Sequence, residues 1–294
     1  MLSTVTRRSD RNYESRMHFT LRIDLSDPDI HRSVPGMLYH YTDAAGLTGI
    51  VKSECRLSAT QHHYVNDSDE IRFGHKIAVE ALGELAIDSD LKALAIAKTD
   101  ALLQGPSFIA CLSAHQDILT QWRLYAKETA GYCLGFKDPR PDAYHAGEDG
   151  EARVAYDLFE CVYGETKLRE RLAQRFQRKI DRLKEVATDD KSDVLTDQLA
   201  QVAWRYAQLA KHEHFLFESE WRFVVWEADP VIQYRLTKRG LTPYLFTDKL
   251  KLEEVWIGPG VGPTPEEARD AVTKFLATQG LSPKVLHWKT SYRG

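Results

Sequence analysis

The sequence predicts an α+β protein with a mixed, mainly antiparallel sheet core, peripheral helices and an inserted helical hairpin. Strand-like apolar runs stand before and after the helical segments and do not alternate strictly with them, which favours α+β over a doubly wound arrangement. The glycine-rich run at residues 258–262 has neither a Walker lysine nor GxGxxG spacing. It therefore indicates a turn and not a nucleotide-binding loop.

The predicted elements follow one another from residue 37. Short strands are expected at 37–40, 56–59, 107–113, 132–136, 217–226, 244–246, 255–257 and 284–288. Helices are expected at 43–52 with Asp43 as N-cap, at 67–103 with a break near 88–90, and after Asp117, which can cap its helix. A last helix begins at Pro265 with Thr264 as N-cap.

Residues 1–35 are polar and weakly patterned, so they predict an N-terminal extension. Residues 36–294 predict a single α+β domain, and two amphipathic stripes place a helical insert at about 165–211. The net charge of −4 gives no overall attraction to nucleic acid or anionic lipid.

The expected compartment is the cytoplasm, without a membrane partner. No apolar run reaches the ~18 residues of a membrane span, and the N-terminus lacks the apolar region of a secretory signal. The four cysteines contain no CxxC pair. Cys111 and Cys133 lie in apolar runs, which predicts reduced and buried thiols.

The first segment that suggests chemistry surrounds His40. On a strand, His40 and Thr42 share one face, whereas Tyr39 and Tyr41 share the other. An imidazole and a hydroxyl are thus presented together at a strand end, where ligands often bind. A structural alternative stays open, because a single histidine is often a satisfied, half-buried residue.

The second segment is 217–223. If it forms a strand, its period of two places Glu218, Glu220 and Arg222 on one face. Acids are depleted in strands, and the apolar run that follows predicts burial. Paired carboxylates raise one pKa while the arginine lowers the other, a pattern typical of functional sites. An edge strand that faces water is the alternative.

Two weaker signals concern metals and polyanions. The segment 211–214 and the pair at 62–63 contain histidines but no HExxH spacing, so no metal is expected. Residues 165–184 carry eight Lys or Arg against three acids. This excess of positive charge is typical of a solvated helix face, and a surface for a phosphate backbone is the alternative.

Five motifs, taken in order, resemble a known family. They are LYHYTDAAGLTGIVKSECRLSAT, YVNDSDE, FIACLSAHQDILTQWRLYAKETAGYCLGF, FESEWRFVVW and VWIGPGV. Together they are similar, over about residues 37–290, to the bacterial family catalogued as a domain of unknown function, number twenty-nine seventy-one. This resemblance implies no particular activity.

The opening block also resembles ADP-ribosyltransferases, including the DNA-modifying toxin group, in which a strand histidine precedes a helix. The resemblance implies that NAD is consumed as co-substrate. It implies that His40 holds the nicotinamide ribose with help from Thr42, and that Tyr41 belongs to the same cofactor-binding group. Ser58 or Tyr64 would supply the middle motif.

The resemblance also assigns roles to the second segment. Glu218 and Glu220 look like the ExE arrangement of some of these enzymes, which implies that Glu220 is catalytic and Glu218 auxiliary. Arg222 would fix a carboxylate or contact the pyrophosphate. The acceptor would be a nucleic acid or a protein.

Two other functions stay open. In one, the chain is a non-enzymatic protein- or nucleic-acid-binding module, and the two glutamates form a structural ion network with Arg222. In the other, which is less favoured, the carboxylates serve a metal-dependent hydrolase.

Overall fold

The computed structural model describes residues 34–65, 68–127, 130–139, 156–185, 191–225 and 232–289. Most of the predicted extension at 1–35 lies outside these ranges. The strands are β1 (Met37–Thr42), β2 (Ser58–Gln61), β3 (Phe108–Ser113), β4 (Tyr132–Lys137), β5 (Tyr156–Glu160), β6 (Val162–Tyr163), β7 (Ala210–Lys211), β8 (Glu220–Val225), β9 (Gln233–Thr237), β10 (Gly240–Phe246), β11 (Lys251–Ile257) and β12 (Lys284–His287).

The helices are α1 (Ala44–Lys52), α2 (Ser68–Gly83), α3 (Ser89–Gln104), α4 (Leu119–Tyr125), α5 (Glu165–Glu185), α6 (Lys191–Leu209) and α7 (Pro265–Thr278). Two 3₁₀ helices, η1 (His62–Tyr64) and η2 (Glu213–Glu218), join them. The predicted α+β class is confirmed. In the described ranges no helix has the length and apolar composition of a membrane span.

The main sheet is mixed and mainly antiparallel. In the part of the chain that is described, its strands follow the order β12-β11-β4-β1-β3-β2-β10-β9, and β8 and β5 branch from β3. Among the described strands of this sheet, only β11 and β12 pair in parallel. A separate pair, β6 and β7, is also parallel.

The sheet forks at β3. One edge of β3 pairs with β8 along its whole length. The other edge meets β2 at Phe108 and Ile109, and it meets β1 only at Ser113. Residues 110–112 lie between these two neighbours, so β1 and β2 diverge at the middle of β3. This divergence positions the candidate site.

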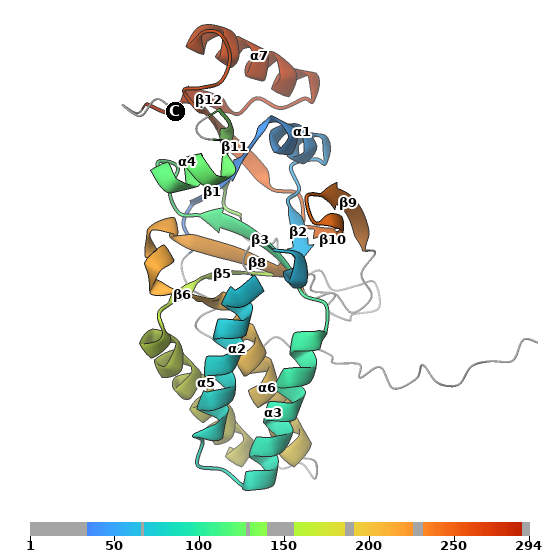
Figure 1. Cartoon of the computed structure of the whole chain (residues 1–294), viewed down its shortest axis with the longest axis vertical. Helices are drawn as coiled ribbons and strands as arrows, with labels where there is room; N and C mark the ends of the chain where they lie inside the picture. The colour runs from blue at the N-terminus through green and yellow to red at the C-terminus, as the bar shows by residue number, and fades with distance from the viewer. Residues whose placement is uncertain are drawn as a thin grey trace, which may run out of the picture.

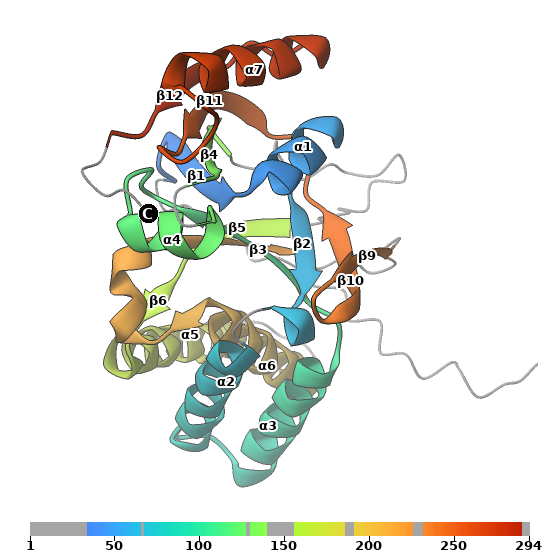
Figure 2. The same cartoon turned by 45° about the horizontal axis from the view of Figure 1, so that its top comes forward.

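Helices cover the two ends of the sheet (Figures 1 and 2). Helices α2, α3, α5 and α6 stand together below it, whereas α1 and α7 lie at the opposite end. The helices of the predicted insert, α5 and α6, form one layer with α2 and α3. Their side chains share one core with α2, α3 and the sheet, including Leu82, Phe176, Leu199 and Val224.

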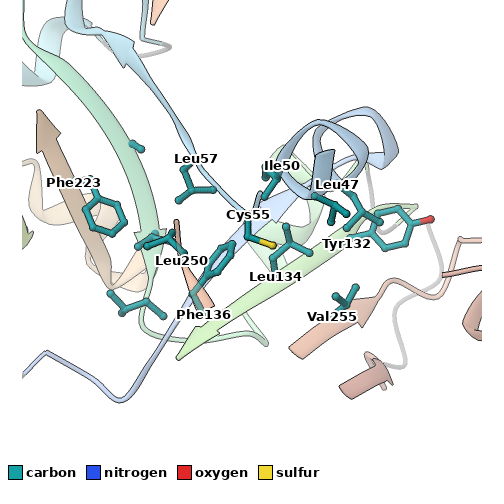
Figure 3. Packing of buried hydrophobic residues seen from close by; sticks show 14 of the residues in the cluster. Leu47, Ile50, Cys55, Leu57, Tyr132, Leu134, Phe136, Phe223, Leu250 and Val255 are labelled. Atoms are coloured by element: carbon teal, nitrogen blue, oxygen red, sulfur yellow. The ribbon is translucent and has the colours of Figure 1, made fainter. Parts of the chain in front are cut away.

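A second core lies between the sheet and helices α1 and α7. Figure 3 shows Leu47 and Ile50 of α1 beside Leu134 and Phe136 of β4. Burying side chains of this size contributes roughly 1.5–3 kcal/mol each. The predicted caps of the flanking helices are confirmed: Asp43 accepts from the Gly46 amide and Thr264 accepts from the Glu267 amide.

Stability at acidic pH is predicted to depend on His62 of η1, which is 3% exposed and packs against Trp204. Burial, and then the neighbouring His63, lowers the pKa of His62 to about 4. Unfolded histidine has a pKa of about 6.5, so the unfolded chain binds more protons than the folded chain between these values. The folded state therefore loses stability as the pH falls through this window.

From pH 7 to pH 5 this loss amounts to about 2 kcal/mol. Urea denaturation at the two pH values should show that His62→Leu removes this part of the pH dependence. Replacing the exposed His214 by leucine serves as the control and should leave it in place. An unchanged pH dependence in His62→Leu contradicts the prediction.

Candidate functional site

A cleft of about 910 Å³ opens at the fork of the sheet. This volume lies within the roughly 300–1,000 Å³ of small-molecule sites. All eight residues that the sequence suggested line this fork cleft: His40, Tyr41, Thr42, Ser58, Tyr64, Glu218, Glu220 and Arg222. Segments distant in the chain are thus brought to one concave surface.

His40 occupies the gap in the ladder of β3. Its Nδ1 lies 2.9 Å from the carbonyl oxygen of Cys111, a residue between the neighbours β1 and β2. Because a carbonyl can only accept, Nδ1 carries the proton and Nε2 is left as an acceptor. Burial lowers the pKa of His40, against a smaller opposite effect of the Cys111 carbonyl. The ring is therefore neutral and held in one orientation.

The neighbours of His40 on β1 have different surroundings. The Tyr41 hydroxyl donates to the His115 carbonyl at 2.8 Å and accepts from the Ile118 amide at 3.1 Å. The N-cap residue of α4 is Ile118, which has no side-chain cap, so the prediction that Asp117 caps this helix is wrong. The bond from the Ile118 amide to the Tyr41 hydroxyl holds this end of the helix. Tyr41 is accordingly bound into the loop that leads to α4.

Thr42 is buried against helix α1. A Cβ added to Gly46 would lie 1.8 Å from Thr42 Oγ1. Only glycine at this position therefore lets α1 approach the end of β1 so closely. The approach places the first turns of α1 in the wall of the fork cleft.

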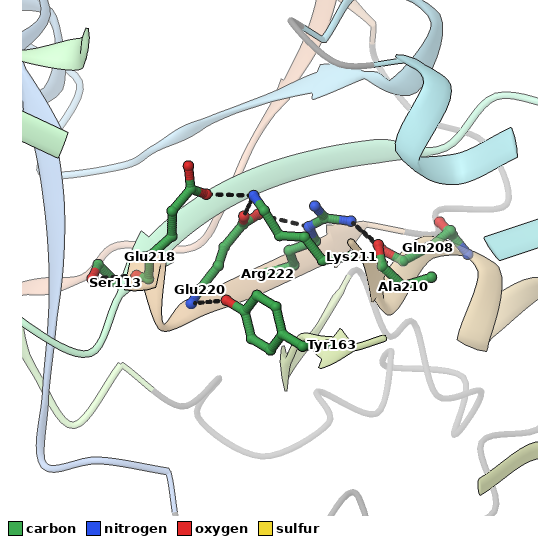
Figure 4. Close-up of polar contacts among 8 residues, drawn as sticks. All are labelled: Ser113, Tyr163, Gln208, Ala210, Lys211, Glu218, Glu220 and Arg222. Carbon is green, nitrogen blue, oxygen red and sulfur yellow. Dashed lines mark hydrogen bonds and ion pairs between the residues drawn. The ribbon is translucent and has the colours of Figure 1, made fainter. Parts of the chain in front are cut away.

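Four charged side chains form a buried cluster, which we call the ionic cluster: Lys211, Glu218, Glu220 and Arg222 (Figure 4). The Lys211 ammonium group lies between the carboxylates of Glu218 and Glu220 and contacts both. Arg222 Nε donates to Glu220 Oε1 at 2.7 Å. The four side chains are 3–5% exposed. Two cations and two anions cancel, which is how buried charges are tolerated.

Glu220 is held in its ionised form. Burial by itself raises the pKa of Glu220, but Arg222 and Lys211 outweigh it and lower the pKa to about 2. A carboxylate with such a pKa is a weak base. It is suited to accept a hydrogen bond from a hydroxyl or to stabilise positive charge. Its position is fixed further by its backbone N–H, which donates to the Tyr163 hydroxyl at 2.7 Å.

The structure corrects the expected geometry of the second segment. Strand β8 begins at Glu220, whereas Glu218 ends η2, and Ser219 between them adopts a left-handed conformation with φ 45°. Glu218 therefore does not lie on the strand, and Lys211 brings the two carboxylates together. Arg222 also donates to the Gln208 carbonyl at 2.6 Å. These contacts favour the first of its two expected roles, the fixing of a carboxylate.

The prediction of a buried thiol holds for Cys133 and is wrong for Cys111, which is exposed in the fork cleft. Cys111 pairs with Arg222 across the two strands. Although the thiol opens onto the cleft, the protein groups around it reduce its hydration, and this effect, followed by the charge of Glu220, raises the pKa of the Cys111 thiol well above its usual value. The apolar run around it predicted a strand covered on both faces, and the fork uncovers one of them.

Several residues of the fork cleft were not expected from the sequence. In the sequence, Lys211 appeared only in the histidine-containing segment 211–214, which was a weak signal for a metal site. None of its neighbours in the chain indicates that it pairs with two glutamates. Other unexpected lining residues are Arg56, Gln121, Tyr125, Arg235, Lys238 and Arg239. No described residue of α5 lines the cleft, although this helix carries the basic stretch. Arg169 of α5 instead pairs with Glu80 of α2, with Glu84 just beyond α2 and with Glu165 of its own first turn.

Among the described residues, no group of three or more His, Cys, Asp or Glu side chains is arranged to hold a metal ion. The donors of the ionic cluster are already taken by Lys211 and Arg222. The described lining of the fork cleft consists partly of hydrogen-bonding and charged side chains, which can contact a polar ligand.

Comparison with protein families gives a match in the middle of the chain. The family model described as "Protein of unknown function (DUF2971)" matches residues 121–223. Over this stretch the chain is similar to DUF2971. The stretch similar to DUF2971 runs from α4 into β8 and contains the whole ionic cluster. Neither the curated proteins nor the solved structures give a match.

Removing Lys211 is predicted to destabilise the fold strongly. Lys211→Met leaves two buried carboxylates beside one another with only Arg222 to compensate them. Breaking such a buried pair costs roughly 3–5 kcal/mol. The double variant Lys211→Met/Glu218→Gln removes one charge of each sign and should recover more than half of this loss. Urea denaturation at pH 7 measures both, and equal stabilities of wild type and Lys211→Met would refute the burial of this cluster.

Cys111 is predicted to be the one described cysteine that reacts in the folded protein, since Cys55, Cys133 and Cys161 are buried. Its raised pKa leaves little thiolate, so alkylation by iodoacetamide should be slow at pH 7 and accelerate up to and beyond pH 9. Mass spectrometry of the native protein measures the label at each cysteine. Modification of two or more cysteines at equal rates would contradict the cleft geometry.

Proposed function

We propose that this protein is an NAD-consuming enzyme of the ADP-ribosyltransferase-like kind, with its active site in the fork cleft. One observation carries the proposal. A neutral, oriented histidine on β1 and an ionised glutamate on β8 line the same cleft, although they are 180 residues apart in the chain. Cys111 links them, because its carbonyl accepts from His40 and its thiol lies beside Glu220.

The proposed reaction breaks the bond between the ribose C1 and the nicotinamide nitrogen. The bonding electrons leave with nicotinamide, and positive charge develops on the ribose. An ionised carboxylate beside that charge stabilises it. The acceptor then attacks C1 and releases a proton.

The described residues suit these tasks in different ways. Nε2 of His40 is an acceptor for a ribose hydroxyl, and Thr42 lines the same cleft. Glu220 is the proposed catalytic residue, because its low pKa keeps it charged throughout the reaction. Glu218 is the proposed auxiliary carboxylate. Lys211 and Arg222 are positioning residues, which hold the carboxylates in place.

The middle motif of the site remains a choice between two residues. Ser58 of β2 and Tyr64 of η1 both line the fork cleft. Tyr125 of α4 is a third residue of the wall, and burial followed by the charge of Glu218 raises its pKa. An aromatic ring at either tyrosine is suited to pack against a flat base.

A second function is favoured by a specific observation. Both oxygens of Glu220 already have cationic partners, as expected of a structural ion network in a binding module. In that case the cluster supports the fold of a protein- or nucleic-acid-binding surface without turnover. The two functions differ in what the loss of Glu220 changes.

The test is nicotinamide release from NAD by the purified full chain. We predict that Glu220→Gln lowers the rate by ~10²–10³, the range for loss of one charge-stabilising group. His40→Ala should lower the rate and raise the KM for NAD. Arg178→Gln on α5 is the control, because this exposed residue lies outside the cleft, and it should retain the wild-type rate.

A stability measurement separates the two functions. Glu220→Gln/Lys211→Met keeps the charges balanced, so it should be better folded than Glu220→Gln and equally inactive. If the wild type releases no nicotinamide with nucleic-acid or protein acceptors, and Glu220→Gln changes only the melting temperature, the enzymatic proposal is refuted and the binding module is favoured.

A further inference from the structure

The β9–β10 hairpin forms one wall of the fork cleft and has two different faces. Arg235 and Thr237 of β9 line the cleft together with Thr242 and Tyr244 of β10. Their strand neighbours point the other way, as Leu236, which is 84% exposed, shows. The polar and cationic face of the hairpin is thus the one turned to the site.

The described lining of the fork cleft carries more positive than negative side chains, although the chain as a whole carries a charge of −4. Among its described lining residues, six are Lys or Arg and three are Asp or Glu. The ionic cluster is neutral by itself, and Asp43 pairs with Lys127 at 3.2 Å. The excess positive charge therefore comes from Arg56 and from the hairpin residues Arg235, Lys238 and Arg239.

Two of these cations are held in place before any ligand binds. Arg235 lies over the ring of Tyr244, 5.4 Å from its centroid, and donates to Thr60 Oγ1 at 2.7 Å. That bond uses one of the five N–H donors of a guanidinium. Arg239 donates to the Val65 carbonyl at 2.8 Å, which ties the hairpin to the end of η1. Such fixed cations lose little conformational entropy when an anion binds.

The position of Arg235 connects this wall to the proposed reaction centre. Arg235 is near enough to His40 for its charge to contribute to the lowered pKa of the ring. Because His40 and Arg235 line the same cleft, a nucleotide whose ribose contacts His40 can extend towards Arg235. Guanidinium groups bind phosphate oxygens through paired N–H donors.

We propose that the β9–β10 hairpin binds the diphosphate of a nucleotide, through Arg235 and Arg239 with Lys238 at the turn. The inference deepens the proposed function and rests on it for the identity of the whole substrate. A small ligand is favoured over a nucleic-acid strand, because these cations line a cleft of about 910 Å³, a volume typical of small-molecule sites. The basic helix α5 does not line the cleft and uses Arg169 in internal ion pairs.

The test is isothermal titration of the full chain with ADP, which contains the diphosphate but no nicotinamide. Arg235→Gln/Arg239→Gln should weaken ADP binding at least about tenfold. Lys238→Gln changes only an exposed turn residue and should weaken it by a smaller factor. Arg178→Gln removes the same charge from α5 and should bind ADP like the wild type.

The outcomes distinguish this inference from the function on which it rests. If ADP binds through the hairpin but the protein releases no nicotinamide from NAD, the diphosphate site is supported and the proposed transferase activity is refuted. If wild-type protein does not bind ADP, or if both hairpin variants bind it normally, the inference is overturned. It is also overturned if a short single-stranded oligonucleotide binds through the hairpin and ADP does not.

Discussion

The hydrogen bond between His40 Nδ1 and the Cys111 carbonyl is the constraint from which the site follows. A strand that is shared by two diverging neighbours leaves backbone groups without a ladder partner, and such groups must be satisfied in another way. Here a side chain from β1 does so. The same bond sets the tautomer of His40 and turns its second nitrogen into an acceptor. The fork in the sheet and the chemistry of the histidine thus have one origin.

The ionic cluster on the other side of Cys111 has a different physical basis. Its four charges are nearly removed from water, so each needs a partner of opposite sign. Lys211 and Arg222 reach Glu220 from β7 and from β8 itself, and the backbone carbonyl of Gln208 takes a further donor of Arg222. Arrays of this kind hold side chains in one geometry, which serves an active site and a rigid scaffold equally well.

Much of the fold and part of the site could be predicted from local signals. Asp43 and Thr264 act as caps within their own helical turns, and the apolar run of β3 is visible in the sequence. Glu220 and Arg222 share a strand face because of the period of two. The left-handed conformation of Ser219 could not be predicted, because the residue is not a glycine. This conformation removes Glu218 from the strand.

The sequence by itself determined the α+β class and the residues whose neighbours in the chain decide their conformation. Only the tertiary structure decided that His40 meets Cys111, that Lys211 joins two glutamates and that a basic hairpin forms one wall of the cleft. Such contacts join residues from separate strands and loops, and no periodicity in the chain encodes them. They form because a carbonyl without a ladder partner and charges removed from water must be satisfied, and groups from other segments supply the partners that their own segments lack.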